Sequence, residues 1–433
     1  MATLAPSKLR NERGPQAARK RATRLDRILG IGARMMNELG PGGVRLGLIA
    51  EELGCSRNAL YYYVRDRRDL VALCYQQTCD LVAAAIAESQ DRDPAEAIVQ
   101  IVDTLLGRHA NGQPFAVISD AAMLADTDRV RIEAQVAANA GALARLIEGG
   151  IASGDFHRCD VDLCAQMILG MVNWAILWNK WIMPTEEVPP EIYRKAAETI
   201  SDIVLRGITM PEGAAFRCPD GLPQRVAALV GTTAGQGRSG AAPGLLETAS
   251  LLFNRYGPES VSLDQIAAHI GLTKGAIYHH FADKQALLVA AHERAFDLQH
   301  GFVDLADAEP VSDRERMLCV FYANCLAHAT DAPPVALHPG LHALPVSILE
   351  RASQSAKRMR RMHARALREP LMRPTDAAIV ELTAGAFFWL QTWRSQRDDL
   401  SPEGIAAEMA SIVATGLMAT SRSSQRPSRD PEN

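Results

Sequence analysis

Residues 265–287, QIAAHIGLTKGAIYHHFADKQAL, contain the signals that decide the fold of this 433-residue chain. Just before them, Ser262 is followed three positions later by Gln265, a capping box that predicts the start of a helix. Gly271 suits the left-handed residue that ends such a helix. A second short helix is predicted at 274–281, directly after the glycine turn. Two short helices joined in this way are typical of a helix-turn-helix unit.

The residues on either side complete the unit. Thr273 is an expected side-chain cap for the second short helix. Upstream, 245–256 places apolar residues at helical spacing and predicts an amphipathic helix, which Gly257 and Pro258 end. The pattern therefore predicts three helices, of which the third is free to enter a major groove.

The same pattern occurs earlier in the chain. Residues 48–70, LIAEELGCSRNALYYYVRDRRDL, align without a gap at an offset of 217, with helices predicted at 46–53 and 57–64. Far downstream, 170–178 aligns with 385–393 at an offset of 215, and this pair holds four of the five tryptophans. Because the offsets agree so closely, the repeat covers whole units, roughly 20–210 and 241–418.

Composition favours an all-α fold with two tandem units. Hydrophobic residues make up 48% of the chain and aromatic residues only 5%, and runs of β-branched residues are few. The predicted domains are a basic flexible arm (1–22), a first helix-turn-helix domain (23–75), a first helical sensing domain (76–210), a linker with a short helix at 224–230 (211–240), a second helix-turn-helix domain (241–292), a second helical sensing domain (293–418) and a disordered tail (419–433).

Charge, cysteines and hydropathy narrow the class of protein. The net charge is −4, but residues 1–80 hold 14 Lys and Arg against 8 Asp and Glu, while 238–300 holds 5 against 6. A basic head on acidic bodies is typical of a modular DNA-binding protein. None of the eight cysteines forms a CxxC pair, so we expect reduced thiols in the cytoplasm and no metal site. The longest apolar run, 165–178, is interrupted by polar residues and is too short for a membrane span.

The two helix-turn-helix stretches resemble the N-terminal domain of the TetR family of transcriptional regulators. Both carry the family's short reading helix, with its Leu/Ile-Tyr-x-His/Tyr-Phe/Val ending and a following Lys or Arg. The resemblance implies that Arg57 and Asn58 contact bases from the start of the first helix, and Lys274 from the start of the second, where Gly275 allows the backbone to come close to the DNA. It implies phosphate contacts for Arg67 and Lys284, at the starts of the next helices. The remaining implied DNA contacts are Arg45, Ser56, Tyr61, Tyr62, Tyr63, Ser262, Thr273, Tyr278, His279 and His280.

The family resemblance also implies that the helical half of each unit binds a small molecule and forms the dimer interface. Each residue in the predicted ligand-binding set is also a candidate for the ordinary core. An arginine-rich helix at 351–368 is either a solvated face or a site for an anionic ligand, so the effector is expected to be apolar or anionic. The set comprises Phe115, Met123, Met167, Met171, Trp174 and Trp178 in the first unit, and His328, Met359, Met362, Phe388, Trp389 and Trp393 in the second.

These features predict a sequence-specific regulator that binds double-stranded operator DNA, with repression relieved by a ligand as the family default. Two arrangements stay open: the two units form an intramolecular pseudo-dimer, or two chains form a homodimer with four reading units. Two alternative functions also stay open, a regulator in which only one helix-turn-helix contacts DNA, and an activator. No catalytic motif is recognisable, so neither an enzyme activity nor a cofactor is expected.

Overall fold

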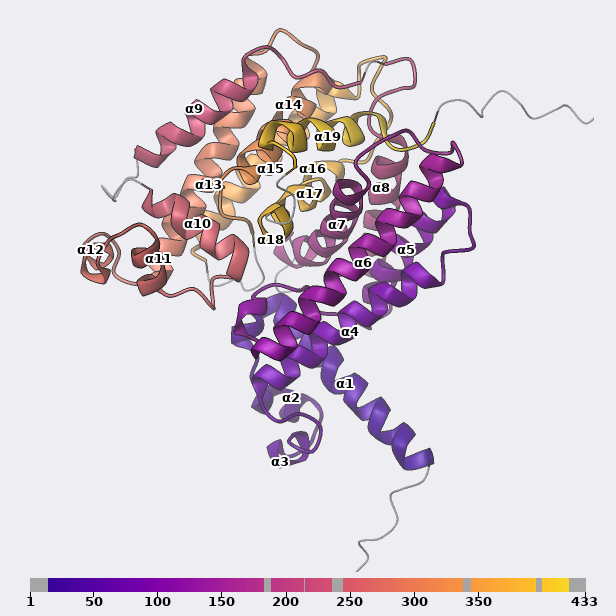
Figure 1. The fold of residues 1–433 in the computed structure, drawn as a ribbon, viewed down its shortest axis with the longest axis vertical. Helices are drawn as coiled ribbons and strands as arrows, with labels where there is room; N and C mark the ends of the chain where they lie inside the picture. Colours follow the sequence, from indigo (N-terminus) through magenta and orange to yellow (C-terminus); the bar gives the residue numbers. More distant parts are fainter. Residues whose placement is uncertain are drawn as a thin grey trace, which may run out of the picture.

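The computed structural model describes residues 15–182, 188–213, 215–235, 244–337, 344–394 and 399–419 (Figure 1). Within these ranges every regular element is a helix, and the only β-type pairing is two isolated bridges. The all-α fold expected from the sequence is confirmed.

The helices form two runs in the same order. The N-terminal half contains α1 (Pro15–Leu39), η1 (Pro41–Gly43), α2 (Leu46–Glu52), α3 (Arg57–Leu60), α4 (Arg67–Ala87), α5 (Pro94–Ala110), η2 (Ala121–Met123), α6 (Asp126–Ala152), α7 (Val161–Ile182) and α8 (Pro190–Arg206). The C-terminal half contains α9 (Leu222–Gly235), α10 (Leu245–Tyr256), α11 (Leu263–His269), α12 (Lys274–His280), α13 (Lys284–Asp307), α14 (Asp313–Ala329), α15 (Val346–Ala366), α16 (Ile379–Leu382), α17 (Gly385–Phe388), α18 (Leu390–Trp393) and α19 (Pro402–Thr415).

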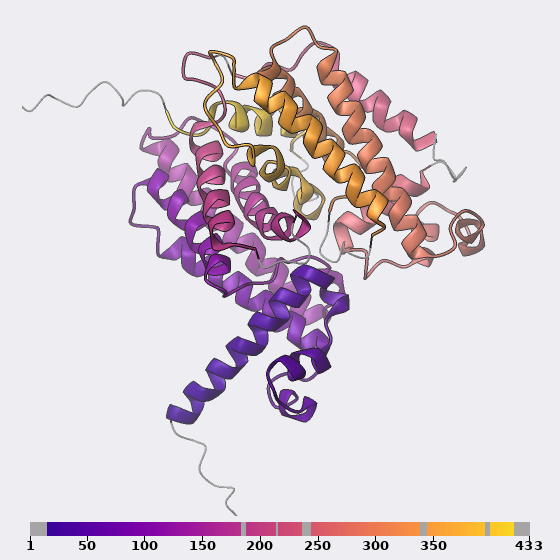
Figure 2. The ribbon, with the colours of Figure 1, turned by 180° about the vertical axis from the view of Figure 1, so that it is seen from behind.

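The basic arm differs from its prediction. Helix α1 begins at Pro15, so residues 15–22 are helical rather than flexible, and Figure 2 shows α1 projecting from the body as one long helix. The physical reason is local: proline is favoured in the first turn of a helix, and the alanines, lysine and arginines that follow are strong helix formers. Residues 1–14 of the predicted arm lie outside the described residues, as do 420–433 of the predicted tail.

The predicted linker is also more ordered than expected. Its short helix, predicted at 224–230, is the 14-residue helix α9, which packs against α13 and α14. Leu222 and Val226 are buried in this contact. Burial of its apolar face therefore extends the helix beyond the stretch that local signals indicated.

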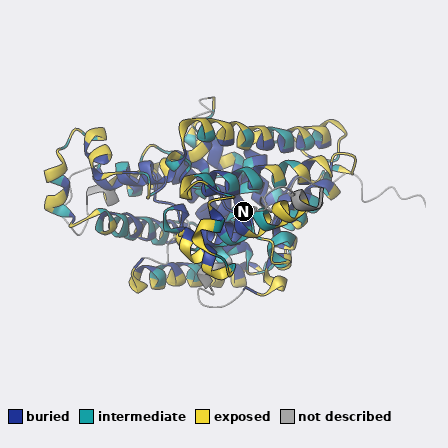
Figure 3. Cartoon of the chain, turned by 90° about the horizontal axis from the view of Figure 1, so that it is seen from below, coloured by how far each residue is buried: buried dark blue, intermediate teal, exposed yellow. Residues whose placement is uncertain are grey.

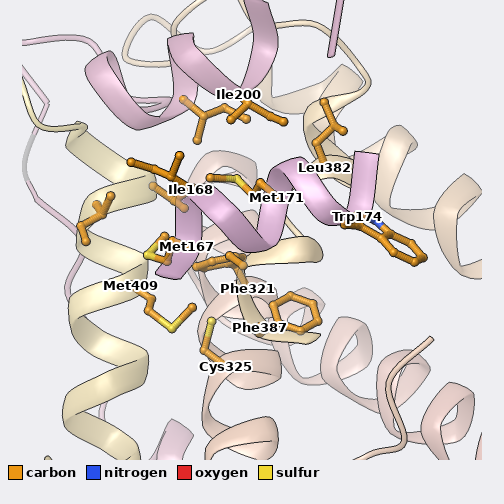
Figure 4. Packing of buried hydrophobic residues seen from close by; sticks show 14 of the residues in the cluster. Met167, Ile168, Met171, Trp174, Ile200, Phe321, Cys325, Leu382, Phe387 and Met409 are labelled. Atoms are coloured by element: carbon orange, nitrogen blue, oxygen red, sulfur yellow. The ribbon is translucent and has the colours of Figure 1, made fainter. Parts of the chain in front are cut away.

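The buried residues form three clusters. One lies inside each three-helix unit at the start of a half, and the third and largest is shared between the two halves. Figure 3 shows buried residues along the interior and exposed residues on the outer helix faces. In Figure 4, Met171 and Trp174 on α7 lie between Ile200 of α8 and the C-terminal half, represented by Phe321 and Phe387.

The ends of α8 and α19 join the halves through reciprocal backbone contacts. Equivalent groups on the two halves exchange the same bonds, as in an interface with two-fold symmetry. The isolated bridges are also a matched pair, Phe156 with Met418 and Thr209 with Met372. The reciprocal bonds are Ile208 N to Val413 O (3.0 Å) with Leu417 N to Val204 O (2.9 Å), and Thr209 N to Ala414 O (2.9 Å) with Met418 N to Leu205 O (2.9 Å).

Helices α7 and α17 cross at two equivalent glycines. A Cβ atom on Gly170 would lie 2.4 Å from the backbone oxygen of Gly385, and one on Gly385 would lie 2.6 Å from that of Gly170. These distances leave no room for a side chain at either position. Because both residues are glycines, the two backbones can touch. The sequence match at 170–178 and 385–393 therefore marks the contact between the halves.

Candidate functional site

The first helix-turn-helix unit consists of α2, a turn at Gly54 and α3. Ser56 caps α3 by accepting a hydrogen bond from Ala59 N (3.3 Å), as its side chain predicts. The helical part of α3 ends at Leu60, earlier than the predicted 57–64, and residues 61–63 form a turn. Buried Leu60 closes the helix onto the core and leaves the start of α3 outside.

The predicted base-reading residues are on the surface. Arg57, Asn58, Tyr61 and Tyr62 are exposed, and Tyr63 is half-buried against the core. The guanidinium of Arg21, on the projecting part of α1, lies 4.9 Å from the centre of the Tyr62 ring. This cation–π contact connects the basic helix to the reading helix.

A shallow surface hollow of about 570 Å³ lies between α2, α3 and the start of α4. Four arginines line it, and two of them are engaged. Arg65 pairs with Asp69 (2.7 Å), and Arg67 donates to Gly42 O (2.6 Å). The guanidinium groups of Arg45 and Arg57 have no hydrogen-bond or ion-pair partner in the described part of the chain, so both are available to an anion. Phosphate oxygens are the anions that arginine recognises best at a DNA surface.

The second unit forms as its caps predict. Ser262 and Gln265 make the capping box, with Gln265 N 3.2 Å from the Ser262 hydroxyl and Ser262 N 2.7 Å from Gln265 Oε1. Thr273 caps α12 by accepting from Ala276 N (3.3 Å). Helix α12 ends at His280, one residue before the predicted end.

The second reading helix carries little available charge. Lys274 is exposed, but it pairs with Asp264 over 2.8 Å. Gly275, Tyr278 and His279 are also exposed, whereas His280 is half-buried. At the position equivalent to Asp264, the first unit has a glycine, Gly47. The acidic partner of Lys274 is therefore a property of the second unit alone.

Lys284 does not have the geometry expected of a phosphate ligand. Its ammonium group turns inward and donates to the carbonyl oxygens of Pro258 (2.8 Å), Val261 (3.2 Å) and Glu259 (3.3 Å). The equivalent Arg67 bonds the equivalent turn at Gly42. Both residues therefore bond to backbone carbonyl oxygens and hold the turn after the first helix of their unit.

Comparison with known families agrees with this geometry. The family described as bacterial regulatory proteins, tetR family, matches residues 245–291, and the tetracyclin repressor-like C-terminal domain matches residues 91–182. The chain belongs to the TetR family of bacterial regulatory proteins. It is a TetR-family DNA-binding transcriptional regulator, and the family's N-terminal model covers α10, α11 and α12 of the second unit.

Individual relatives of this TetR-family chain are distant. The Transposon Tn10 TetC protein of Escherichia coli is 42% identical over 50 residues, which are 12% of this chain and a quarter (25%) of that protein. The structure of AibR in complex with isovaleryl coenzyme A and operator DNA is 22% identical in sequence, with a TM-score of 0.35. The match covers 42% of this chain and 97% of the AibR chain. The TetR-family regulator PfmR from Thermus thermophilus is 24% identical and covers 40% and 96%, with a TM-score of 0.34.

A cavity of about 150 Å³ is lined mainly by residues of the C-terminal half of this TetR-family chain. Five of the twelve predicted ligand-binding residues line it: Trp174, Trp178, His328, Met359 and Phe388. The two tryptophans belong to the other half, so the cavity lies where the halves meet. His292 of α13 also lines it and was not predicted. A lone histidine in an apolar stretch gives no signal in sequence that separates a cavity wall from a filled core.

The other seven predicted ligand residues lie elsewhere. Met167, Met171 and Met362 are buried in the shared core, as is Trp393, and Trp389 packs against this core. Phe115 is buried, and its carbonyl oxygen accepts from Asn37. Met123 is half-buried beside the first helix-turn-helix unit. These seven residues do not line the cavity.

The arginines of helix α15 mainly form ion pairs within the fold. Four of its arginines pair with acidic residues of neighbouring elements, so most of its charge is already neutralised within the fold. The described ranges contain no group of three or more His, Cys, Asp or Glu side chains that could hold a metal ion. The pairs are Arg351 with Asp297, Arg358 with Asp304, Arg360 with Glu381, and Arg365 with Asp313.

Two helices meet the length and hydropathy of a membrane span, which the sequence pattern did not lead us to expect. They are α4, at Arg67–Ala87, and α7, over Val161–Trp178. Half of the α4 window and two-thirds of the α7 window are buried inside the protein. Core helices of soluble proteins have the same composition, so these helices are weak support for a membrane location.

Proposed function

We propose that the two halves form an intramolecular pseudo-dimer that presents α3 and α12 to one operator. The reciprocal bonds between α8 and α19 support this arrangement, because a homodimer of a half-length chain would exchange the same bonds. The order of the family matches supports it as well, since a C-terminal domain at 91–182 precedes an N-terminal domain at 245–291. The proposed reading domains are 23–75 and 241–292, and the proposed sensing domains are 76–210 and 293–418.

The two reading helices would then bind unequal half-sites. In the first unit, Arg45 and Arg57 line one hollow without partners in the described chain, whereas Lys274 in the second unit is held by Asp264. This difference in available charge is the observation that carries the proposal. We expect the first unit to supply most of the affinity for phosphates, and the pair to recognise an imperfect palindrome.

The test compares Arg57→Ala with Lys274→Ala. Binding is measured by fluorescence anisotropy on duplex DNA from the region upstream of the chain's own gene, at several salt concentrations. Arg57→Ala should weaken binding about tenfold or more and reduce the salt dependence, because a guanidinium that contacts DNA is lost. Lys274→Ala should weaken it measurably but less than about threefold, because Lys274 already has an acidic partner.

Arg92→Ala is the matched control, an exposed arginine in the turn between α4 and α5, far along the chain from either reading helix. It should bind DNA as the unchanged protein does. If neither Arg57→Ala nor Lys274→Ala weakens binding, the assignment of α3 and α12 is wrong. If Arg57→Ala weakens binding and Lys274→Ala has no effect, the result favours the alternative in which a single helix-turn-helix contacts DNA. The low charge of the second unit is the observation behind that alternative.

The proposed regulation is repression in the cytoplasm that a small molecule relieves. The cavity in the C-terminal half supports a ligand site, because its walls include α13, the helix that begins directly after the second reading unit. A ligand there can change the orientation of α12 through α13 and so change operator affinity.

A further inference from the structure

The cavity belongs to both halves. Helices α13, α14 and α15 and the segment from α16 to α17 form most of its wall, and the rings of Trp174 and Trp178 on α7 complete it. Trp174 is held in place, since its Nε1 donates to Glu381 O (2.9 Å) and its ring meets Phe388 edge to face at 4.8 Å. A molecule in the cavity therefore touches the N-terminal and the C-terminal half at once.

The wall contains a buried histidine with one ring nitrogen that lacks a hydrogen-bond donor in the described chain. His292 is fully buried, and its Nδ1 lies 2.8 Å from Leu288 O. Burial lowers the pKa of His292 to about 4, so the ring is neutral at physiological pH. A carbonyl oxygen only accepts hydrogen bonds, so Nδ1 must carry the hydrogen. Nε2 is then a bare acceptor, and no group in the described chain donates to it.

The N-terminal half lacks this acceptor. The repeat places Tyr75 at the position of His292, and the Tyr75 side chain is also fully buried. Its hydroxyl is already satisfied by the backbone of Ser119, at 3.2 Å from the oxygen and 3.3 Å from the nitrogen. Unlike His292, Tyr75 leaves no hydrogen-bonding capacity that a ligand would complete.

The wall also disfavours an anion. Its residues are mainly aromatic and aliphatic, and its carboxyl group, that of Glu381, has its pKa raised by burial and pairs with Arg360. A carboxylate ligand would face the lone pair of Nε2 and no unpaired cation in this wall. Burying a charge without a partner is strongly unfavourable, whereas a neutral donor gains a hydrogen bond.

We propose that this cavity binds one neutral, largely apolar molecule per chain, which donates a hydrogen bond from a hydroxyl or amide N–H to Nε2 of His292. This inference rests on the proposed ligand-responsive function and names the chemistry of its effector. A cavity of this size holds a molecule of about the size of benzene. A larger effector would place one such group inside and the remainder towards the opening.

The test uses three probes of similar size: benzyl alcohol, toluene and benzoate. Calorimetry on the full chain should give one benzyl alcohol per chain, bound about 2–10-fold more tightly than toluene, since one hydrogen bond separates them. Benzoate should bind more weakly than toluene. His292→Phe should remove the preference for the alcohol over toluene. The control His300→Phe, on the same helix but outside the wall, should retain it.

A second measurement needs no variant. In protein labelled with ¹⁵N-histidine, the Nε2 resonance of His292 should shift with benzyl alcohol and stay in place with toluene. Two sites per chain, benzoate as the tightest probe, or an unmoved resonance would each overturn the proposal. Measuring DNA binding without ligand separates a failure of this inference from a failure of the proposed function. If the chain binds the operator but the three probes do not bind in the expected order, only this inference is wrong. If the probes bind in the expected order but the chain does not bind DNA, the proposed function is wrong instead.

Discussion

Asp120, in the segment between α5 and η2, reaches across to the C-terminal half and accepts a hydrogen bond from Glu259 N (3.1 Å). The contact is close: a Cβ on Gly257, whose φ is +82°, would lie 1.8 Å from Asp120 Oδ1. Burial raises the pKa of Asp120 to about 7, and the carboxylate of Glu259 adds to the rise, while backbone hydrogen bonds and Lys284 oppose it. An ionisable group therefore sits in the joint between the halves.

The elevated pKa predicts a pH-dependent stability. An unfolded aspartate titrates near pH 4. Between about pH 4 and 7 the folded chain keeps a proton that the unfolded chain has lost, so the free energy of unfolding falls as the pH rises through this window and levels off above it. Asp120→Asn should remove this contribution, which is on the order of a few kcal/mol.

Urea unfolding of both proteins at pH 5 and pH 8 measures this effect. Other groups titrate alike in the two proteins and cancel in the comparison. The native chain should lose more stability than Asp120→Asn on going from pH 5 to pH 8. An equal loss in both would show that Asp120 ionises in the folded chain as it does in the unfolded one.

At the scale of elements, the crossing of α7 and α17 is the contact that a small change should disturb most. Gly170→Ala places a methyl group against the backbone of Gly385, which no rotamer relieves. We expect a loss of about 1–3 kcal/mol in the free energy of unfolding, as for other overpacked contacts. Gly149→Ala on α6 is the control, because a Cβ there meets no neighbour and alanine favours the helix by about 0.5–1 kcal/mol.

Urea unfolding of the two glycine variants checks this prediction. Gly149→Ala should be as stable as the original chain or more stable, and Gly170→Ala should be clearly less stable. Equal stability of the two variants would mean that α7 and α17 do not touch at this point, and that the halves meet differently.

At the scale of the whole molecule, one chain contains both reading units and the interface that joins them. We therefore predict a complex of one chain with one operator duplex. Native mass spectrometry, or sedimentation of the complex at concentrations well above the dissociation constant, counts the chains directly. Two chains per minimal operator would contradict the pseudo-dimer and favour the homodimer with four reading units.

Local signals in the sequence were enough to place several elements. The capping box at Ser262, the cap at Ser56 and the helix at 245–256 are all as predicted, because a cap depends on residues one turn away. The repeat also predicted that the halves share one order of helices. Asn37 and Asn254 lie 217 positions apart and donate to equivalent loops, at Phe115 O and Pro334 O, but the repeat alone gave no sign of these partners.

Which surfaces meet, and which polar groups are left over, depends instead on the three-dimensional packing. The sequence position of Lys284 predicts a phosphate contact, yet its ammonium group donates hydrogen bonds to three carbonyl oxygens of the preceding turn. The two tryptophans of α7 reach a cavity in the opposite half, and His292 faces it with no donor to Nε2 in the described chain. These outcomes depend on contacts between residues far apart in the chain, where packing and hydrogen-bond satisfaction outweigh local propensity. The difference in charge between the two reading units is already in the sequence, but packing decides which of their basic side chains stay available. Among the described residues it is the C-terminal half that contributes a histidine without a donor at Nε2 to the cavity.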